Sequence, residues 1–286
     1  MTATLECLRV EPGDEAFGLS PVLAESMVVS ASGAGGAVGC DHRPTLALVR
    51  RQRPYALLGP RDLRLPRVGD GVAFLERRGL PAFARIGGGS LVVLDDDCLS
   101  FALAWRCRNP THVGLAVRGL AAPALAALAR LGVAARMGAA PGSYCEGPSD
   151  LVAPDGRKIA GIAAALRGGW ALVSGMLLVR QDPAYATGVV AGFEAVAGGN
   201  RRYDAGAVTN LERVLGRPLA VESVAAALIA ALGHWADAEG ATAVERSPRA
   251  AELAIARVLF ERRRVRPSAM GGKIGRAATG LAQSRT

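Results

Sequence analysis

The most restrictive feature of the sequence is an apolar stretch of 21 residues, Ile159 to Val179, which only Arg167 and Ser174 interrupt. Its length matches that of a membrane-spanning helix. Four glycines lie inside it, namely Gly161, Gly168, Gly169 and Gly175. Glycines at this density disfavour a helix, and the central Gly-Gly pair is typical of a hairpin turn. We therefore expect two buried strands joined by a turn, and no membrane partner.

The hydrophobic spacing along the rest of the chain predicts helices and strands in mixed order. Helices are expected over 13–32, 68–78, 114–132, 221–235 and 248–264, with Pro123 either bending or starting the third of them. Strands are expected within 45–58, around a turn at Arg53-Pro54, and over 82–86, 91–94 and 101–105. This order predicts an α+β fold with a mixed, largely antiparallel sheet flanked by helices.

The chain is large and apolar enough to bury a sizeable core, since half of its 286 residues are hydrophobic. Its 13 aromatic residues leave few surfaces for stacking on bases, so specific nucleic-acid binding is not expected. The net charge of +9 is concentrated at the C-terminus, because residues 261–286 hold seven basic residues and one acidic residue. We expect a catalytic domain over 1–264 and a basic, glycine-rich, disordered tail over 265–286.

Cysteine usage points to a reducing compartment. The five cysteines, Cys7, Cys40, Cys98, Cys107 and Cys145, form no CxxC pair and have no histidine at ligand spacing. Neither a disulfide framework nor a metal site is therefore expected. The first ten residues contain Glu6 and lack the basic and apolar regions of a secretory signal. These observations predict a cytoplasmic protein.

Two side chains are candidates for chemistry. Cys145 lies in a Gly/Pro-rich loop, a position that is more typical of a nucleophile than of a packing cysteine. Lys158 is one of only two lysines among 34 basic residues, and it opens an apolar strand 13 residues after Cys145. An ammonium near a thiol favours the thiolate. The pair could therefore perform acyl transfer, although an inert packing cysteine and a solvated turn lysine are the alternatives.

Three segments resemble signatures of one known family, that of the lipoate-protein ligases and octanoyltransferases. The segment from Ala84 to Val92, Ala-Arg-Ile-Gly-Gly-Gly-Ser-Leu-Val, followed by Asp95, resembles the family's arginine, triple-glycine and aspartate signature. Asp155-Gly-Arg-Lys-Ile-Ala-Gly161 resembles its lysine signature, and Tyr144-Cys-Glu-Gly-Pro-Ser-Asp-Leu151 is similar to the cysteine loop of its octanoyltransferases. The resemblance extends over about residues 10–235 and implies the biotin/lipoate protein ligase catalytic fold.

The resemblance also implies roles for the candidate residues. Cys145 would carry the acyl group as a thioester, and Lys158 would bind the acyl carbonyl or, in a ligase, the phosphate of an acyl-adenylate. The substrate would contact Arg85, Gly87, Gly88, Gly89, Ser90, Gly156 and Gly161. No metal ligand is implied. The implied partners are an octanoyl-acyl carrier protein or a lipoyl protein as donor, and lipoyl carrier domains of 2-oxoacid dehydrogenases or the glycine-cleavage H protein as acceptors.

Several positions depart from the family pattern. Ser90 stands in place of the signature's last glycine, and Leu94 and Ser174 stand where histidines are usual. These departures, together with the cysteine loop, favour an octanoyl or lipoyl transferase that needs no cofactor. The alternatives are an ATP- and magnesium-dependent lipoate-protein ligase and a non-catalytic subunit of ligase-like fold.

Overall fold

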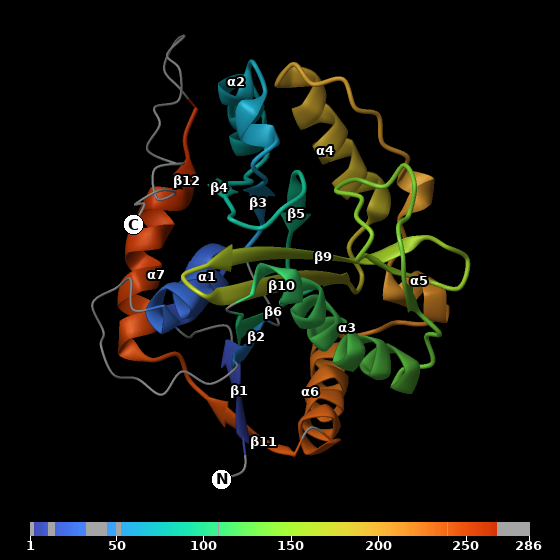
Figure 1. The fold of residues 1–286 in the computed structure, drawn as a ribbon. Coiled ribbons are helices and arrows are strands. Elements are labelled where there is room, and N and C mark those ends of the chain that lie inside the picture. The colour runs from blue at the N-terminus through green and yellow to red at the C-terminus, as the bar shows by residue number, and fades with distance from the viewer. Residues whose placement is uncertain are drawn as a thin grey trace.

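The computed structural model describes residues 3–10, 15–32, 45–49, 53–107, 109–238 and 240–267. Within these residues an eight-stranded sheet runs in the order β11-β1-β2-β6-β10-β9-β8-β7 (Figure 1). Its strands are β1 (Ala3–Val10), β2 (Thr45–Val49), β6 (Cys98–Arg106), β7 (Arg136–Met137), β8 (Leu151–Val152), β9 (Lys158–Arg167), β10 (Trp170–Leu178) and β11 (Ala241–Arg246). Among the described strands of this sheet, the parallel pairs are β1–β2 and β1–β11, and the other pairs are antiparallel. The prediction of a mixed, largely antiparallel sheet is confirmed.

A second sheet of four strands, in the order β12-β4-β3-β5, lies beside the first. Its strands are β3 (Tyr55–Leu58), β4 (Ala82–Ala84), β5 (Val92–Leu94) and β12 (Arg264–Val265). The strands expected within 45–58 are therefore present but belong to different sheets, β2 to the larger and β3 to the smaller. The turn signal at Arg53-Pro54 does not reveal that the chain changes sheets between these two strands.

Helices cover both sheets. The helices are α1 (Ser20–Ala31), α2 (Val68–Glu76), α3 (Val113–Arg130), α4 (Pro183–Val196), α5 (Leu211–Leu215), α6 (Val221–Ala238) and α7 (Ala250–Arg263). Short 3-10 helices are η1 (Glu15–Leu19), η2 (Asp62–Arg64), η3 (Pro110–His112) and η4 (Ala205–Ala207). Helices α1 and α7 pack together on one face of the large sheet, α3 and α6 on the other, and α2 and α4 on the small sheet (Figure 1). The α+β prediction is confirmed.

The apolar stretch that dominates the sequence forms the antiparallel hairpin β9–β10. Gly168 and Gly169 make the turn with φ values of 54° and 77°, which L-residues with side chains rarely adopt. Side chains of β10 alternate between the two faces of the sheet: Ala171 and Val173 pack toward α3, and Trp170 and Leu172 toward α1. The expectation of a buried hairpin is confirmed.

Helix α3 is the one described helix whose length and composition would suit a membrane span, over Pro110–Arg130. It buries Leu120, Ala124 and Leu128 in the core of the large sheet, as a core helix does. The helix passes through Pro123, so the idea that it starts there is wrong. Burial of this face outweighs the backbone hydrogen bond that Pro123 cannot make.

The structure differs from the sequence prediction in two further segments, one for which no element was predicted and one that was assigned to the tail. Helix α4, capped by Asp182 at its N-terminus, occupies a stretch for which no element was predicted. Val265, the first residue assigned to the tail, lies in β12 and pairs with Ala82 of β4. The rest of the expected tail from residue 268 onward lies outside the described residues, as does part of the segment 13–32.

Candidate active site

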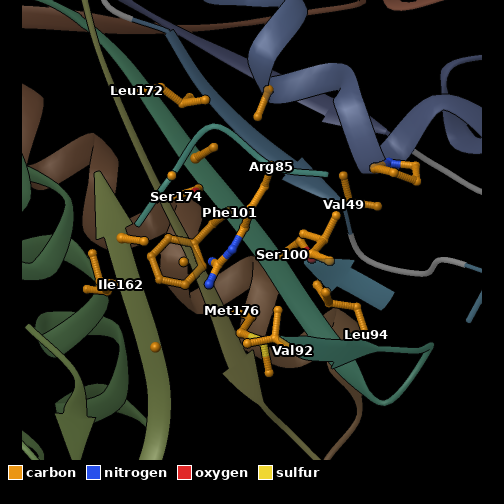
Figure 2. A pocket seen from close by; sticks show the side chains of 18 of the residues that line it. Val49, Arg85, Val92, Leu94, Ser100, Phe101, Ile162, Leu172, Ser174 and Met176 are labelled. Carbon is orange, nitrogen blue, oxygen red and sulfur yellow. The ribbon is translucent and has the colours of Figure 1, made fainter. Parts of the chain in front are cut away.

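A mostly apolar pocket lies between α1, the large sheet and the small sheet. Its walls come from Leu23, Ala24, Ala47, Val49, Leu57, Val92, Leu94, Phe101, Ile162, Leu172 and Met176. Figure 2 shows Arg85 extending among these side chains. Cys145 and Lys158 also line the pocket, so the structure brings both candidate residues to one cavity. An apolar cavity with a few convergent polar groups is the usual form of a small-molecule site.

Cys145 lies on the loop between β7 and β8, as the sequence predicts. It has a φ of +48° and is the one described residue other than glycine with a positive φ. Such a conformation persists only where the surroundings enforce it. The preceding residue supplies one anchor, because the Tyr144 side chain is fully buried. The loop therefore holds the thiol in a defined position.

Two donors face the Cys145 sulfur. The Arg85 Nη2 donates a hydrogen bond to Sγ at 3.1 Å, and the main-chain N–H of Ser90 donates another at 3.4 Å. Burial alone would raise the pKa of the Cys145 thiol, but the charges of Arg85 and Lys158 and these hydrogen bonds outweigh it. The pKa is lowered from its ordinary value. Because the thiolate is the reactive form, the site favours a nucleophile.

Lys158 is the first residue of β9, and only 1% of it is exposed. Its Nζ donates to the carbonyl oxygens of Tyr144 and Cys145, at 3.1 and 2.8 Å. It also forms an ion pair with the Asp150 Oδ2 at 2.9 Å. The alternative of a solvated turn lysine is therefore wrong, because the ammonium lies inside the loop that carries Cys145.

Asp150 is the site residue that sequence reasoning missed. It is 1% exposed, pairs with Lys158 and accepts a hydrogen bond from the Gly147 N–H at 3.0 Å. Burial raises the pKa of its carboxyl, and the neighbouring Lys158 opposes this. The sequence held one signal for Asp150, because an acidic residue lies there between the candidate cysteine and a rare lysine. Only the fold shows that the carboxylate and the ammonium meet.

The glycine loop, Gly87 to Ser90 between β4 and β5, has residues in different environments. Gly87 lines the pocket beside Arg85, whereas Gly88 has open space around it and does not line the pocket. Gly89 has a φ of +93°, and a Cβ there would lie 2.6 Å from the Cys145 Sγ. A side chain at this position would therefore displace the sulfur, so glycine is required for the close approach.

The glycines of the lysine signature also differ in position. A Cβ at Gly161 would lie 3.4 Å from the Lys158 Nζ, and Gly161 lines the pocket. Gly156 lies in the turn before β9 with a φ of +86°, and it is not among the pocket residues. The structure thus places Gly161 at the site and gives Gly156 the role of turning the chain into β9.

The remaining described cysteines lie in the core: Cys7, Cys98 and Cys107 are buried. Burial raises the pKa of the Cys7 thiol to about 11, which keeps it protonated at neutral pH. Cys40 lies outside the described residues. Among the residues that the structure describes, no three His, Cys, Asp or Glu side chains are grouped so that they could hold a metal ion.

Comparison with known families gives one match. The family model described as "Lipoyl protein ligase A/B catalytic domain" matches residues 36–233. This range contains the glycine loop, Cys145 and Lys158, so every candidate site residue lies within the matched region.

Several curated relatives with similar sequences are named as octanoyltransferases. A protein of Exiguobacterium sp. named "Octanoyl-[GcvH]:protein N-octanoyltransferase" is 29% identical over 175 residues, which cover 59% of this chain and 62% of the relative. A protein of the same name from Kyrpidia tusciae is 30% identical over 208 residues, covering 68% of this chain and 71% of that one. The chain thus spans less than two thirds of the first relative's length.

Solved structures show the same fold. The putative lipoate protein ligase Ta0514 of T. acidophilum, with bound lipoic acid, superposes with a TM-score of 0.64 at 21% identity, covering 91% of this chain and 95% of that one. The architecture described above is therefore that of a lipoate protein ligase catalytic domain.

Proposed function

Because the chain belongs to the lipoyl protein ligase A/B catalytic domain family, we propose that it transfers an octanoyl or lipoyl group to a lysine of a lipoyl carrier domain through a thioester on Cys145. The proposal rests on the position of the Cys145 sulfur. The Cys145 Sγ lies at an apolar pocket suited to a fatty acyl chain and receives hydrogen bonds from Arg85 and Ser90.

The proposed reaction has two steps. The Cys145 thiolate attacks the acyl carbonyl of the donor and forms an S–C bond, while the C–N bond of an amide donor or the C–S bond of a thioester donor breaks. The donor leaves as an amine or a thiol, which takes a proton from solvent. The amine of the acceptor lysine then attacks the thioester. Its N–C bond replaces the S–C bond, the amine loses a proton to solvent, and the Cys145 thiolate is restored.

The names of the curated relatives guide the choice of partners. They specify an octanoyl-[GcvH] donor, and the sequence resemblance adds an octanoyl-acyl carrier protein and a lipoyl protein as further donors. We take the octanoylated glycine-cleavage H protein as the first donor to test. The acceptors to test are lipoyl domains of 2-oxoacid dehydrogenases.

The proposal includes no ATP or magnesium step. A ligase of this family would need Lys158 to face the phosphate of an adenylate. In this chain the three N–H groups of the Lys158 ammonium point to Tyr144, Cys145 and Asp150. No donor of Lys158 remains for a phosphate in this arrangement, which supports the transferase over the ligase alternative.

The test is intact-protein mass spectrometry after incubation with each donor, with and without ATP. We expect an octanoyl or lipoyl adduct on the wild-type protein that hydroxylamine removes, and transfer to a lipoyl domain without ATP. The Cys145→Ser variant should form no thioester and transfer nothing. A Cys145→Ala variant with full transfer activity would refute the thioester mechanism, and modification by free lipoate only with ATP would establish the ligase alternative.

A further inference from the structure

Lys158 is expected to contact the acyl carbonyl, yet the structure directs its ammonium elsewhere. Its three N–H groups are matched by three acceptors at 2.8–3.1 Å, and the residue is 1% exposed. An ammonium carries three donors and no more. To reach a substrate oxygen, Lys158 would have to give up one of these partners, and losing Asp150 would leave a carboxylate buried without its counter-charge.

The groups that do face the sulfur are Arg85 and Ser90. The Arg85 Nη2 also donates to the Ser90 carbonyl oxygen at 2.7 Å, which fixes its guanidinium against the glycine loop. The Arg85 Nε is buried and has no hydrogen-bond partner within the described part of the chain. A pocket-lining side chain thus keeps one donor for an acceptor that the protein itself does not provide.

We propose that Arg85 and the main-chain N–H of Ser90 form the oxyanion site of the acyl transfer, while Lys158 and Asp150 act as a clamp that positions Cys145. This inference rests on the proposed thioester mechanism. When Sγ bonds to the carbonyl carbon, negative charge leaves the sulfur and develops on an oxygen two bonds away. Donors already directed at the thiolate are placed to stabilise the charge at its new position.

The clamp follows from the two carbonyls that Lys158 binds. They belong to Tyr144 and Cys145, and the peptides on both sides of the Cys145 Cα are therefore held to one ammonium. On its other side the ammonium meets Asp150, which also binds the Gly147 N–H. The loop from Tyr144 to Asp150 closes around Nζ and stabilises the positive φ of Cys145.

The experiment compares two acyl probes that differ in a single atom, 4-nitrophenyl octanoate and O-4-nitrophenyl thionooctanoate. Both release a chromophore when they acylate Cys145, but the thionoester places sulfur where the oxyanion would form, and sulfur is a weak hydrogen-bond acceptor. The single-turnover rate of the oxoester divided by that of the thionoester therefore reports on the oxyanion donors. Both rates are taken at the high-pH plateau of each variant. Displacement of the nucleophile slows both probes equally and leaves the ratio unchanged.

We expect Arg85→Met to slow the oxoester about 100-fold, the typical effect of removing one oxyanion donor. The thionoester should slow far less, so the ratio collapses. Lys158→Met and Asp150→Asn should slow both probes by similar factors and keep the wild-type ratio. Arg264→Met, which removes a half-buried arginine paired with Glu76 outside the pocket, is the matched control and should change neither rate.

A ratio that falls in Lys158→Met but not in Arg85→Met would overturn the inference, and so would an unchanged ratio in both. If Lys158→Met does not fold, the Asp150→Asn variant decides the clamp. The probes need no protein donor, so the test distinguishes failure of this inference from failure of the proposed function. If the ester acylates Cys145 but no octanoylated protein donor does, the proposed substrates are contradicted and the oxyanion test still stands. Absence of any ester burst in the wild type would overturn both.

Discussion

The ammonium of Lys158 donates a hydrogen bond to the carbonyl oxygen of Cys145 at 2.8 Å. The lysine is thereby tied to the backbone of the nucleophile, whereas two other donors, the Arg85 Nη2 and the Ser90 N–H, contact its sulfur. Arg85 and Ser90 thus act directly on the sulfur, whereas Lys158 holds the loop and adds its charge near the thiol, so the two contributions can be compared by mutation.

Removing Lys158 alone should destabilise the fold. Lys158→Met leaves the Asp150 carboxylate buried without its partner, and we expect the free energy of unfolding to fall by about 3–5 kcal/mol. The double variant Lys158→Met/Asp150→Leu removes both charges and should recover most of this loss without restoring acyl transfer. Urea denaturation measures the stabilities, and a single variant as stable as the wild type would contradict the buried pair.

Lys158→Arg should also lose transfer activity, although it preserves the charge. A planar guanidinium cannot place its donors where a compact ammonium meets three acceptors. Single-turnover acylation measures the loss. Wild-type turnover in this variant would show that charge alone suffices at the position.

The reactivity of Cys145 should persist below the pH range of an ordinary thiol. Its pKa is lowered, so raising the pH through that pKa converts thiol to thiolate, and the rate of alkylation by iodoacetamide rises to a plateau. We expect a midpoint below that of an ordinary cysteine thiol. Arg85→Met removes a positive charge beside the thiolate and should move the midpoint upward. Cys145→Ala supplies the background from other thiols, and equal midpoints in wild type and Arg85→Met would contradict the contact.

Gly89→Ala should abolish acylation, because its Cβ would lie 2.6 Å from the Cys145 Sγ and the backbone φ of +93° disfavours a side chain. Gly88→Ala is the matched control, since a Cβ there meets nothing within 4 Å, and it should lower the rate far less. Mass spectrometry of the acylated protein measures both. Equal losses in the two variants would mean that loop flexibility, rather than contact with the sulfur, matters.

Ending the chain after Arg266 should barely change the melting temperature or single-turnover acylation, because β12 is kept and the removed residues are glycine-rich and polar. Ending it after Arg263 removes Arg264 and Val265, which pair with Phe83 and Ala82 of β4. That truncation should lower the melting temperature clearly. Identical melting curves for the two truncations would show that β12 contributes nothing to stability.

The sequence predicted the features that depend on local chemistry. The Gly168-Gly169 turn, the two apolar strands on either side of it and the cysteine loop are local patterns, and the structure has all of them. The pairing of Lys158 with Asp150 was not predictable, because it needs the register between β8 and β9. Helix α4 was missed, since its glycines and β-branched residues give a weak helix signal and its packing against α2 compensates.

The hairpin β9–β10 carries two functions on one piece of secondary structure. Its first residue, Lys158, belongs to the loop that holds the nucleophile, whereas Ile162, Leu172 and Met176 further along form the cavity wall. In the proposed function these wall residues would meet the acyl chain, so exchanging them should alter the space for carbon atoms while the anchor of the reactive thiol stays in place. We therefore expect the preference for acyl-chain length to be separable from the transfer rate, and a redesign toward longer or branched acyl groups to begin with these three positions.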